Sequence, residues 1–287
     1  LYKFIKQEKP DYIIIHLITV PIMILALLFN FDTKFILRIS GYPKLNLLRK
    51  FFWKICSKKI YKIFTPTKNT KELLVKKNIF PSNKVFLLSD PIISIKNVCK
   101  LKNLPIEDSL ENEEFLLSIG RLTKQKNFSF LIDSFSKIKK SIGQIKLVII
   151  GSGEEKSKLL EKIKNHKLEN QVIIKDYENN IFNYLKKSKL FVLTSEWEDP
   201  GFVLIEAAAT NKLILSSNCL SGPREFLEDG SGYLFEKNNF KDFQEKLFDC
   251  LKNISSKNIN EKKIKAKLKI KPYTIFGHYE NLETLLD

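Results

Sequence analysis

The sequence predicts an α/β fold with parallel sheets, because short apolar runs alternate along the chain with polar turns and helical patterns. The runs at residues 115–119, 144–150 and 189–194 are almost continuously hydrophobic, which is typical of strands buried on both faces of a sheet. The chain has 287 residues, 44% of them hydrophobic. It can therefore bury a large core, and its length suggests two domains.

The amino-terminal part contains strands that lead into polar residues. The first strand ends in His16, and the helix after it carries Pro21 in its first turn, where proline is tolerated. The next strand and its loop hold Arg38, Ser40 and Lys44, which are candidates for ligand contacts. We expect strands at residues 11–16, 33–41, 62–67 and 85–92 and helices at residues 1–9, 21–29 and 68–77.

A membrane-spanning helix is the alternative for the apolar stretch of residues 12–31. His16, Pro21, the run of β-branched isoleucines and the break at Thr19 argue against it. We therefore expect a strand and a helix here.

The carboxyl-terminal part begins after the polar, unpatterned residues 94–112, which are typical of a linker. We therefore expect one domain at residues 1–93 and a second at residues 113–270. Gly120 and the turn at Gly151–Gly153 each follow a strand. The glycines of the turn have two possible roles: they serve the bend alone, or they also contact a ligand. Strands are expected at residues 115–119, 144–150, 171–175, 189–194, 213–217 and 231–235, and helices at residues 154–166 and 202–210 and from Asn127 and Arg224 onward.

Residues 194–206 place two carboxylates on opposite sides of a turn. Glu198 falls in the loop after a strand, and Glu206 lies about two turns into the following helix. Ligands in open α/β sheets bind beyond the carboxyl ends of the strands, so we expect both carboxylates to face one crevice. Glu206 sits within an apolar stretch and needs partners there, such as the hydroxyls of a sugar or ribose. The alternative for both is a helix-start charge that complements the helix dipole.

Four segments, in order and spacing, resemble the retaining glycosyltransferases of family 4. Four ordered matches over roughly half of the chain are far more specific than any single one. The segments are the Gly-Arg-Leu and Lys-Asn pair in residues 117–127, the strand and glycine turn in residues 148–154, the Glu-x7-Glu pattern of Glu198 and Glu206, and Gly-Pro-x-Glu at residues 222–225.

The resemblance implies the GT-B fold, in which two Rossmann-like, doubly wound parallel-sheet domains face a cleft. The second domain would bind a nucleotide sugar, and residues 271–287 would cross back onto the first. The first domain would be incomplete, because the strand, glycine-rich loop and helix units that begin such a domain are absent.

The resemblance also implies an activity: retaining transfer of a sugar, of the hexosyltransferase type, from a nucleotide-diphosphate donor. The acceptor would be a glycan or a lipid-linked saccharide in surface polysaccharide or lipopolysaccharide-type biosynthesis. The departing phosphate would take the acceptor's proton. We expect no cofactor and no metal, because Arg121 and Lys126 supply fixed cations for the diphosphate.

Roles follow for individual residues. Only four of the 49 basic residues are arginines, so Arg121 at a strand end favours a bidentate phosphate contact over a plain surface charge. Asp176 stands where the family usually has glycine, which leaves uridine versus guanosine open. The implied roles are catalytic for Glu198 and His16, donor diphosphate for Arg121 and Lys126, donor sugar and ribose for Gly201, Phe202, Glu206 and Glu225, nucleotide-side loops for Gly120, Gly151 and Tyr177, and acceptor side for Arg38 and Lys44.

Two of these residues keep a second interpretation. His16 lies beside an apolar run, and a lone histidine in that position is more often a satisfied core residue. Glu225 is equally explained as a helix-start carboxylate.

Composition limits the partners. The net charge of +17 is almost wholly lysine, without the aromatic-basic pattern of nucleic-acid binders, so we expect attraction to anionic lipid headgroups instead. The four cysteines form no close pair, so neither a zinc site nor a disulfide framework is indicated. A cytoplasmic protein, peripheral at the inner face of the cytoplasmic membrane, fits both observations. The donor sugar, its base, the acceptor, the linkage and the oligomeric state stay open.

Two other functions remain open from the sequence. One is a nucleotide-sugar epimerase of the same two-lobed architecture. The other is a non-catalytic, basic remnant that binds membranes or nucleic acid.

Overall fold

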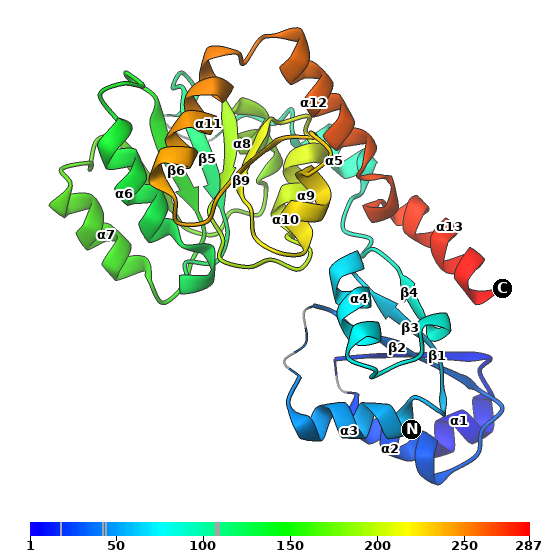
Figure 1. The fold of residues 1–287 in the computed structure, drawn as a ribbon. Helices are drawn as coiled ribbons and strands as arrows, with labels where there is room; N and C mark the ends of the chain where they lie inside the picture. Colours follow the sequence, from blue (N-terminus) through cyan, green and yellow to red (C-terminus); the bar gives the residue numbers. More distant parts are fainter. Residues whose placement is uncertain (18, 42, 44, 107–109) are drawn as a thin grey trace. The chain divides into compact units, whose positions relative to one another are not determined.

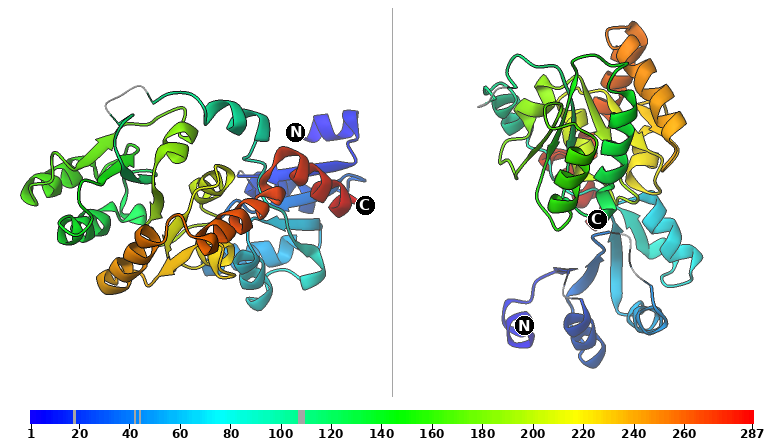
Figure 2. Two further views of the ribbon diagram at one scale, coloured as in Figure 1. Left: turned by 90° about the horizontal axis from the view of Figure 1, so that it is seen from above. Right: turned by 90° about the vertical axis from the view of Figure 1, so that its left-hand side faces the viewer.

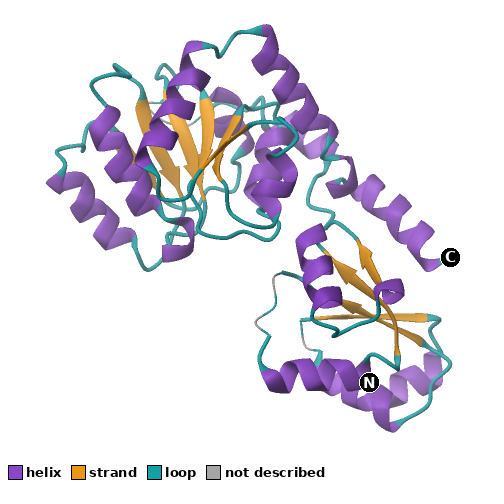
Figure 3. Cartoon of the chain, in the orientation of Figure 1, coloured by secondary structure: helices purple, strands orange, loops and turns teal. Residues whose placement is uncertain are grey.

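The computed structural model describes residues 1–17, 19–41, 43, 45–106 and 110–287. It divides into two compact units. The first unit comprises Leu1–Asp90 and His278–Asp287, and the second comprises Pro91–Gly277. Each unit contains one parallel sheet with helices packed on it (Figures 1 and 3). The predicted α/β class with parallel sheets is therefore confirmed.

The first unit has four parallel strands in the order β1-β2-β3-β4. Crossovers between neighbouring parallel strands are right-handed, so strands added in chain order place their helices on one face of the sheet. The buried residues of helices α2, α3 and α4 accordingly share one core on that face. The elements are α1 (Tyr2–Glu8), β1 (Tyr12–His16), α2 (Val20–Leu28), β2 (Lys34–Arg38), α3 (Leu47–Cys56), β3 (Ile60–Thr65), α4 (Lys68–Lys76), η1 (Ser82–Lys84) and β4 (Val85–Leu87).

The other face of this sheet is covered by the end of helix α13 (Ile275–Leu286). Ile36 and Phe64 point to that face and pack against Leu282, Leu285 and Leu286. The chain thus returns to the first unit within α13, because Gly277 still belongs to the second unit and His278 to the first.

Helix α3 is one of several helices that the sequence patterns do not predict, and it is the one among them that lies in the first unit. Asn46 caps it, since its side chain accepts a hydrogen bond from the Arg49 N–H at 2.8 Å. Trp53 and Cys56 are buried against the sheet, and the Trp53 ring lies 5.7 Å from that of Phe80. An asparagine before apolar residues at helical spacing is the signal that could have identified this helix.

The segment 94–112, expected as a linker, belongs to the second unit. It contains helix α5 (Ile95–Leu101), and its Val98, Ile106 and Leu110 are buried in the core of that unit. Polar residues separate these three anchors in the sequence and conceal the apolar pattern.

The second unit has six parallel strands in the order β10-β9-β8-β5-β6-β7. Successive residues of each central strand point to opposite faces, as in Leu116 and Leu117 of β5. Helices α5, α8, α9 and α10 cover one face, and α6, α7 and α11 cover the other (Figures 1 and 2). The elements are β5 (Phe115–Ile119), η2 (Lys124–Lys126), α6 (Phe128–Ile138), β6 (Lys146–Ile150), α7 (Lys156–Asn165), β7 (Val172–Lys175), α8 (Phe182–Lys187), β8 (Leu190–Leu193), α9 (Phe202–Ala209), β9 (Ile214–Ser217), α10 (Gly222–Leu227), β10 (Tyr233–Phe235), α11 (Phe240–Lys252), α12 (Lys257–Leu268) and η3 (Lys271–Tyr273).

The apolar amino-terminal stretch forms strand β1 and the nine-residue helix α2. Within the ranges that the structure describes, no helix has both the length and the apolar character needed to cross a bilayer.

Candidate functional site

The sheet of the second unit has a switch point between β5 and β8. From β5 the chain adds β6 and β7 on one side, and it then returns to the other side of β5 for β8, β9 and β10. Crossovers leave the sheet in opposite directions at such a point, so a crevice opens at the carboxyl ends of the two strands. A pocket of about 610 Å³ lies here, lined by the loops that follow β5, β6, β7 and β8.

This pocket collects most of the predicted donor-site residues. Gly120 and Arg121 follow β5, Gly151 follows β6, and the remainder come from the loops after β7 and β8 and from α9. The predicted residues that line it are Gly120, Arg121, Lys126, Gly151, Tyr177, Glu198, Gly201, Phe202 and Glu206. Residues that the sequence patterns did not single out also line it, among them Gln125, Ser152, Glu178, Asn179 and Asp199.

Glu198 is held inside the pocket wall. Its side chain is 6% exposed, and its carboxylate accepts hydrogen bonds from the Lys126 ammonium and from Ser195 Oγ, the latter at 2.6 Å. A buried carboxylate needs such partners. Ser195 was not identified from the sequence, although a hydroxyl three residues before a buried carboxylate was the available signal.

Gly120 leaves room for the side chain of Lys126 as it extends to Glu198. A Cβ atom at Gly120 would lie 2.9 Å from Lys126 Cε. The loops after β5 and β8 are also joined directly, since the Glu196 N–H donates to the Gln125 carbonyl at 2.8 Å and Gln125 Nε2 donates to the Trp197 carbonyl at 2.9 Å. These bonds between the two loops fix the position of Lys126 relative to Glu198.

Glu206 presents a carboxylate without a protein partner. It lies in α9, which begins after Gly201 in the left-handed conformation (φ 86°). Its side chain has no hydrogen-bond or ion-pair partner among the residues that the structure describes. Burial raises the pKa of its carboxyl group from 4.5 to about 6. The carboxylate is available to hydroxyl groups of a ligand.

Arg121 lines the same pocket with an exposed side chain. Its guanidinium has no ion-pair or hydrogen-bond partner within the described part of the chain. Gly151 brings the β6 loop against the start of the Arg121 loop, because a Cβ there would lie 1.9 Å from the Gly120 carbonyl oxygen. Arg121 therefore contributes an exposed cation, unpaired within the described residues, to the lining of the pocket, and the loops after β5 and β6 pack closely together beside it.

Glu225 does not line this pocket. It lies in α10, its backbone N–H donates to the Ser221 carbonyl at 3.0 Å, and its position fits the helix-start interpretation. The loop before it does approach the pocket wall: Ser221 Oγ donates to Asp199 at 3.0 Å, and a Cβ at Gly222 would collide with the Pro200 carbonyl.

The predicted acceptor-side residues lie in the first unit. His16 is exposed, with Nε2 2.7 Å from Ser40 Oγ, so the core interpretation of this histidine is wrong. Arg38 is 7% exposed, and its guanidinium donates to the Leu88 carbonyl at 2.6 Å and to Asp90 at 2.5 Å. Lys44 lies outside the described residues.

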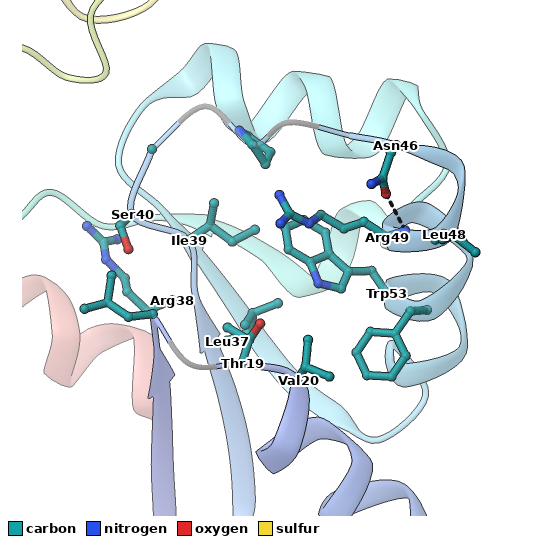
Figure 4. A pocket seen from close by; sticks show the side chains of 14 residues that line it. Thr19, Val20, Leu37, Arg38, Ile39, Ser40, Asn46, Leu48, Arg49 and Trp53 are labelled. Carbon is teal, nitrogen blue, oxygen red and sulfur yellow. Dashed lines mark hydrogen bonds between the residues drawn. The ribbon is translucent and has the colours of Figure 1, made fainter.

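A pocket of about 460 Å³ lies where β2 ends beside α2 and α3 (Figure 4). Arg38 lines it, but its side chain extends away from Arg49 and Trp53 in this view. The Arg49 guanidinium lies over the Trp53 ring, 5.8 Å from its centre.

Comparisons with known proteins agree with this architecture. The family model described as glycosyl transferases group 1 matches residues 101–266, which is more than half of the chain. An uncharacterized glycosyltransferase, MJ1059, of Methanocaldococcus jannaschii is 33% identical over 245 residues, covering 79% of this chain and 60% of the relative. A Campylobacter jejuni protein is 28% identical over 272 residues, covering 93% of this chain and 70% of the relative, and is named an N-acetylgalactosamine-N,N'-diacetylbacillosaminyl-diphospho-undecaprenol 4-alpha-N-acetylgalactosaminyltransferase.

The fold has solved counterparts. The structure of Anabaena Alr3699/HepE in complex with UDP has a TM-score of 0.81 and 14% sequence identity, covering 99% of this chain and 81% of that one. The predicted GT-B architecture is thereby confirmed. Given the family match over residues 101–266 and this fold, the chain belongs to the glycosyl transferases group 1 family.

Proposed function

We propose that this chain takes part in retaining transfer of a sugar from a nucleotide-diphosphate donor to a glycan or lipid-linked acceptor in surface polysaccharide biosynthesis. The donor would bind in the 610 Å³ pocket of the second unit. The family match favours transfer over the epimerase alternative.

The observation that carries the proposal is a pair of uncompensated groups in one pocket. The Arg121 guanidinium and the Glu206 carboxylate both line it, and neither has a protein partner in the described residues. Unpaired polar groups in a concave site favour a ligand that carries complementary groups. A nucleotide diphosphate supplies both, since its phosphates suit the guanidinium and its ribose diol suits the carboxylate.

The remaining lining residues support an order along the donor. Lys126 would share its ammonium protons between Glu198 and a phosphate oxygen, which its three donors permit. Glu198 and the Gly201–Phe202 backbone would orient the sugar, and Tyr177, an exposed residue near the start of the loop after β7, would lie on the nucleotide side.

The two cations also bear on the chemistry. Negative charge grows on the diphosphate as the glycosidic bond breaks, and fixed cations stabilise it. We propose that Arg121 and Lys126 do this without a metal ion. The acceptor hydroxyl would attack from the face of the departing phosphate, which takes the proton, so the anomeric configuration is retained. A catalytic role of His16 stays a prediction.

A lipid-linked acceptor is supported by the Campylobacter jejuni relative, whose name includes a diphospho-undecaprenol-linked substrate. The four cysteines are free in the described structure, which suits a reducing compartment, so we place the reaction in the cytoplasm.

Calorimetric titration with UDP and GDP tests the donor site. Charged hydrogen bonds contribute about 1.5–3 kcal/mol, so Arg121→Ala should weaken binding by about tenfold or more. Lys124→Ala is the matched control, because Lys124 is an exposed cation of the same loop that does not line the pocket. Unchanged affinity in both Arg121→Ala and Glu206→Ala would reject the assignment. Product analysis with donor alone separates slow hydrolysis from epimerisation.

A further inference from the structure

Helix α2 contains no polar residue, and yet some of its apolar side chains are exposed to solvent. Its sequence is Val-Pro-Ile-Met-Ile-Leu-Ala-Leu-Leu. A helix that is hydrophobic all round normally lies in a protein core or in lipid. Met23 and Ala26 are buried against the sheet of the first unit, whereas Val20, Ile24 and Leu28 are exposed along one stripe of the helix.

Helix α3 carries a second exposed stripe. Leu47, Leu48, Phe51 and Ile55 are exposed, and their spacing places them on one side of the helix. Leu47 is 83% exposed and Phe51 is 67% exposed. The opposite side of α3, with Trp53, packs against the sheet.

The two stripes belong to one outer surface. Helices α2 and α3 pack against each other and cover the same face of the four-stranded sheet, so their outward sides both point away from it (Figures 1 and 2). We call this surface the outer apolar face; it consists of Val20, Ile24, Leu28, Leu47, Leu48, Phe51 and Ile55. Contiguous exposed apolar surfaces of this kind mark interaction sites.

Positive charge borders the outer apolar face. Lys50 and Lys54 lie on α3 next to its exposed stripe, and Lys58 follows one turn after Lys54. The sequence contains no Asp or Glu between Asp32 and Glu72, so no carboxylate from this stretch offsets these charges.

We propose that the outer apolar face docks the chain onto the surface of a bilayer that contains anionic lipids. Its leucine, isoleucine and phenylalanine side chains would enter the boundary between headgroups and acyl chains, and the lysines would contact lipid phosphates. A second copy of the chain is the weaker fit, because a two-fold contact through this face would bring equal positive charges together.

The pocket of Figure 4 adds to this assignment. Val20 and Leu48 belong to the outer apolar face and also line that pocket. A substrate held in the bilayer would therefore meet the pocket at the docked surface. The docking makes no use of the donor pocket, so nucleotide binding and membrane binding can fail independently.

Flotation with vesicles of phosphatidylcholine, with and without phosphatidylglycerol, tests the docking surface. Leu47→Ser combined with Phe51→Ser should lower partitioning to the anionic vesicles by about tenfold or more. The matched control is Ile264→Ser combined with Leu268→Ser, which alters two apolar residues, 54% and 73% exposed, at the same spacing on the lysine-rich helix α12. Lys50→Gln and Lys54→Gln should each lower it by about fivefold.

Three readouts decide the outcome. Selective loss in the α3 variant, with unchanged circular dichroism and unchanged nucleotide affinity, supports the proposal. Equal loss in both variants, or equal binding to neutral and anionic vesicles, overturns it. A change from dimer to monomer in the α3 variant, without any vesicle binding by the unmodified chain, would assign the face to a second copy and overturn the lipid proposal.

Discussion

Replacement of Glu206 by glutamine should stabilise the second unit at neutral pH and weaken donor binding at the same time. Burial raises the folded-state pKa of this carboxyl group from 4.5 to about 6. The folded state therefore favours the protonated form, and stability falls as pH rises from the unfolded value through the folded one. Each pKa unit corresponds to about 1.36 kcal/mol, so the full difference is about 2 kcal/mol above pH 6. Because the side chain retains some solvent contact, we expect a gain of about 1–2 kcal/mol in Glu206→Gln at pH 7.5 and almost none at pH 4.

The assay is urea unfolding followed by circular dichroism at both pH values. Nucleotide shifts the transition of the unit that binds it, which identifies the transition to compare. Glu161→Gln on α7 is the control, because Glu161 is exposed and its replacement should change stability by less than about 0.5 kcal/mol.

Donor binding supplies the second half of this prediction. If the proposed donor site is right, ribose hydroxyls stabilise the ionised carboxylate, and nucleotide affinity should then increase as pH rises through about 6. The nucleotide phosphate also titrates in this pH range. Glu206→Gln has no titrating carboxyl group at this position, so the pH dependence that remains in this variant is the contribution of the phosphate. Destabilisation by Glu206→Gln at pH 7.5, with unchanged nucleotide affinity, would show that the carboxylate serves the fold and would refute the reasoning.

Three further predictions concern packing and positioning. Gly151→Ala places a Cβ 1.9 Å from the Gly120 carbonyl oxygen, so it should destabilise the second unit by about 3 kcal/mol or more and abolish nucleotide binding. Gly143→Ala is the control: Gly143 has φ 67° but open space around it, so the change should cost about 1 kcal/mol. Equal midpoints of thermal unfolding for the two variants would contradict this prediction. Ser195→Ala removes a hydrogen-bond donor to the buried Glu198 and should lower the free energy of unfolding by about 1–2 kcal/mol. Calorimetry should show that affinity for a nucleotide sugar falls more than affinity for the nucleotide alone. The opposite order would show that Glu198 does not contact the sugar. Asp90→Asn leaves the buried Arg38 guanidinium without its counter-charge and should destabilise the first unit by about 2 kcal/mol, whereas Asp32→Asn, at an exposed position, should change little. Equal urea midpoints for the two variants would show that the Arg38–Asp90 ion pair does not stabilise the unit.

Secondary structure followed from the sequence where one strong signal was present. The strands of the second unit are continuous apolar runs, and α9 begins at the break before Phe202, so both appear where the patterns place them. Helix α3 was missed although Asn46 precedes apolar residues at helical spacing; in the structure Trp53 lies inward, and Leu47 and Leu48 on the other side of the helix are exposed. The linker expectation at residues 94–112 failed because three isolated apolar residues decide its packing.

The candidate site was predictable as a set of residues but not as a set of contacts. Arg121, Glu198 and Glu206 follow from strand ends, spacing and burial pattern. The bond from Ser195 to Glu198 and the absence of Glu225 from the pocket depend on how the loops after β8 and β9 pack.

The sequence by itself determined the α/β class, the strands of both sheets and the residues that gather at the donor pocket, because hydrophobic periodicity and strand-end position are local properties of the chain. Only the tertiary structure decided which of these residues have partners. Lys126 pairs with Glu198, 72 residues further along the sequence, and Arg38 pairs with Asp90, 52 residues further along. Glu206 has no protein partner among the described residues. The exposed face of α2 and α3 was decided in the same way. Apolar residues alone predict burial, and only the packing of the two helices on one sheet face shows which of them stay outside.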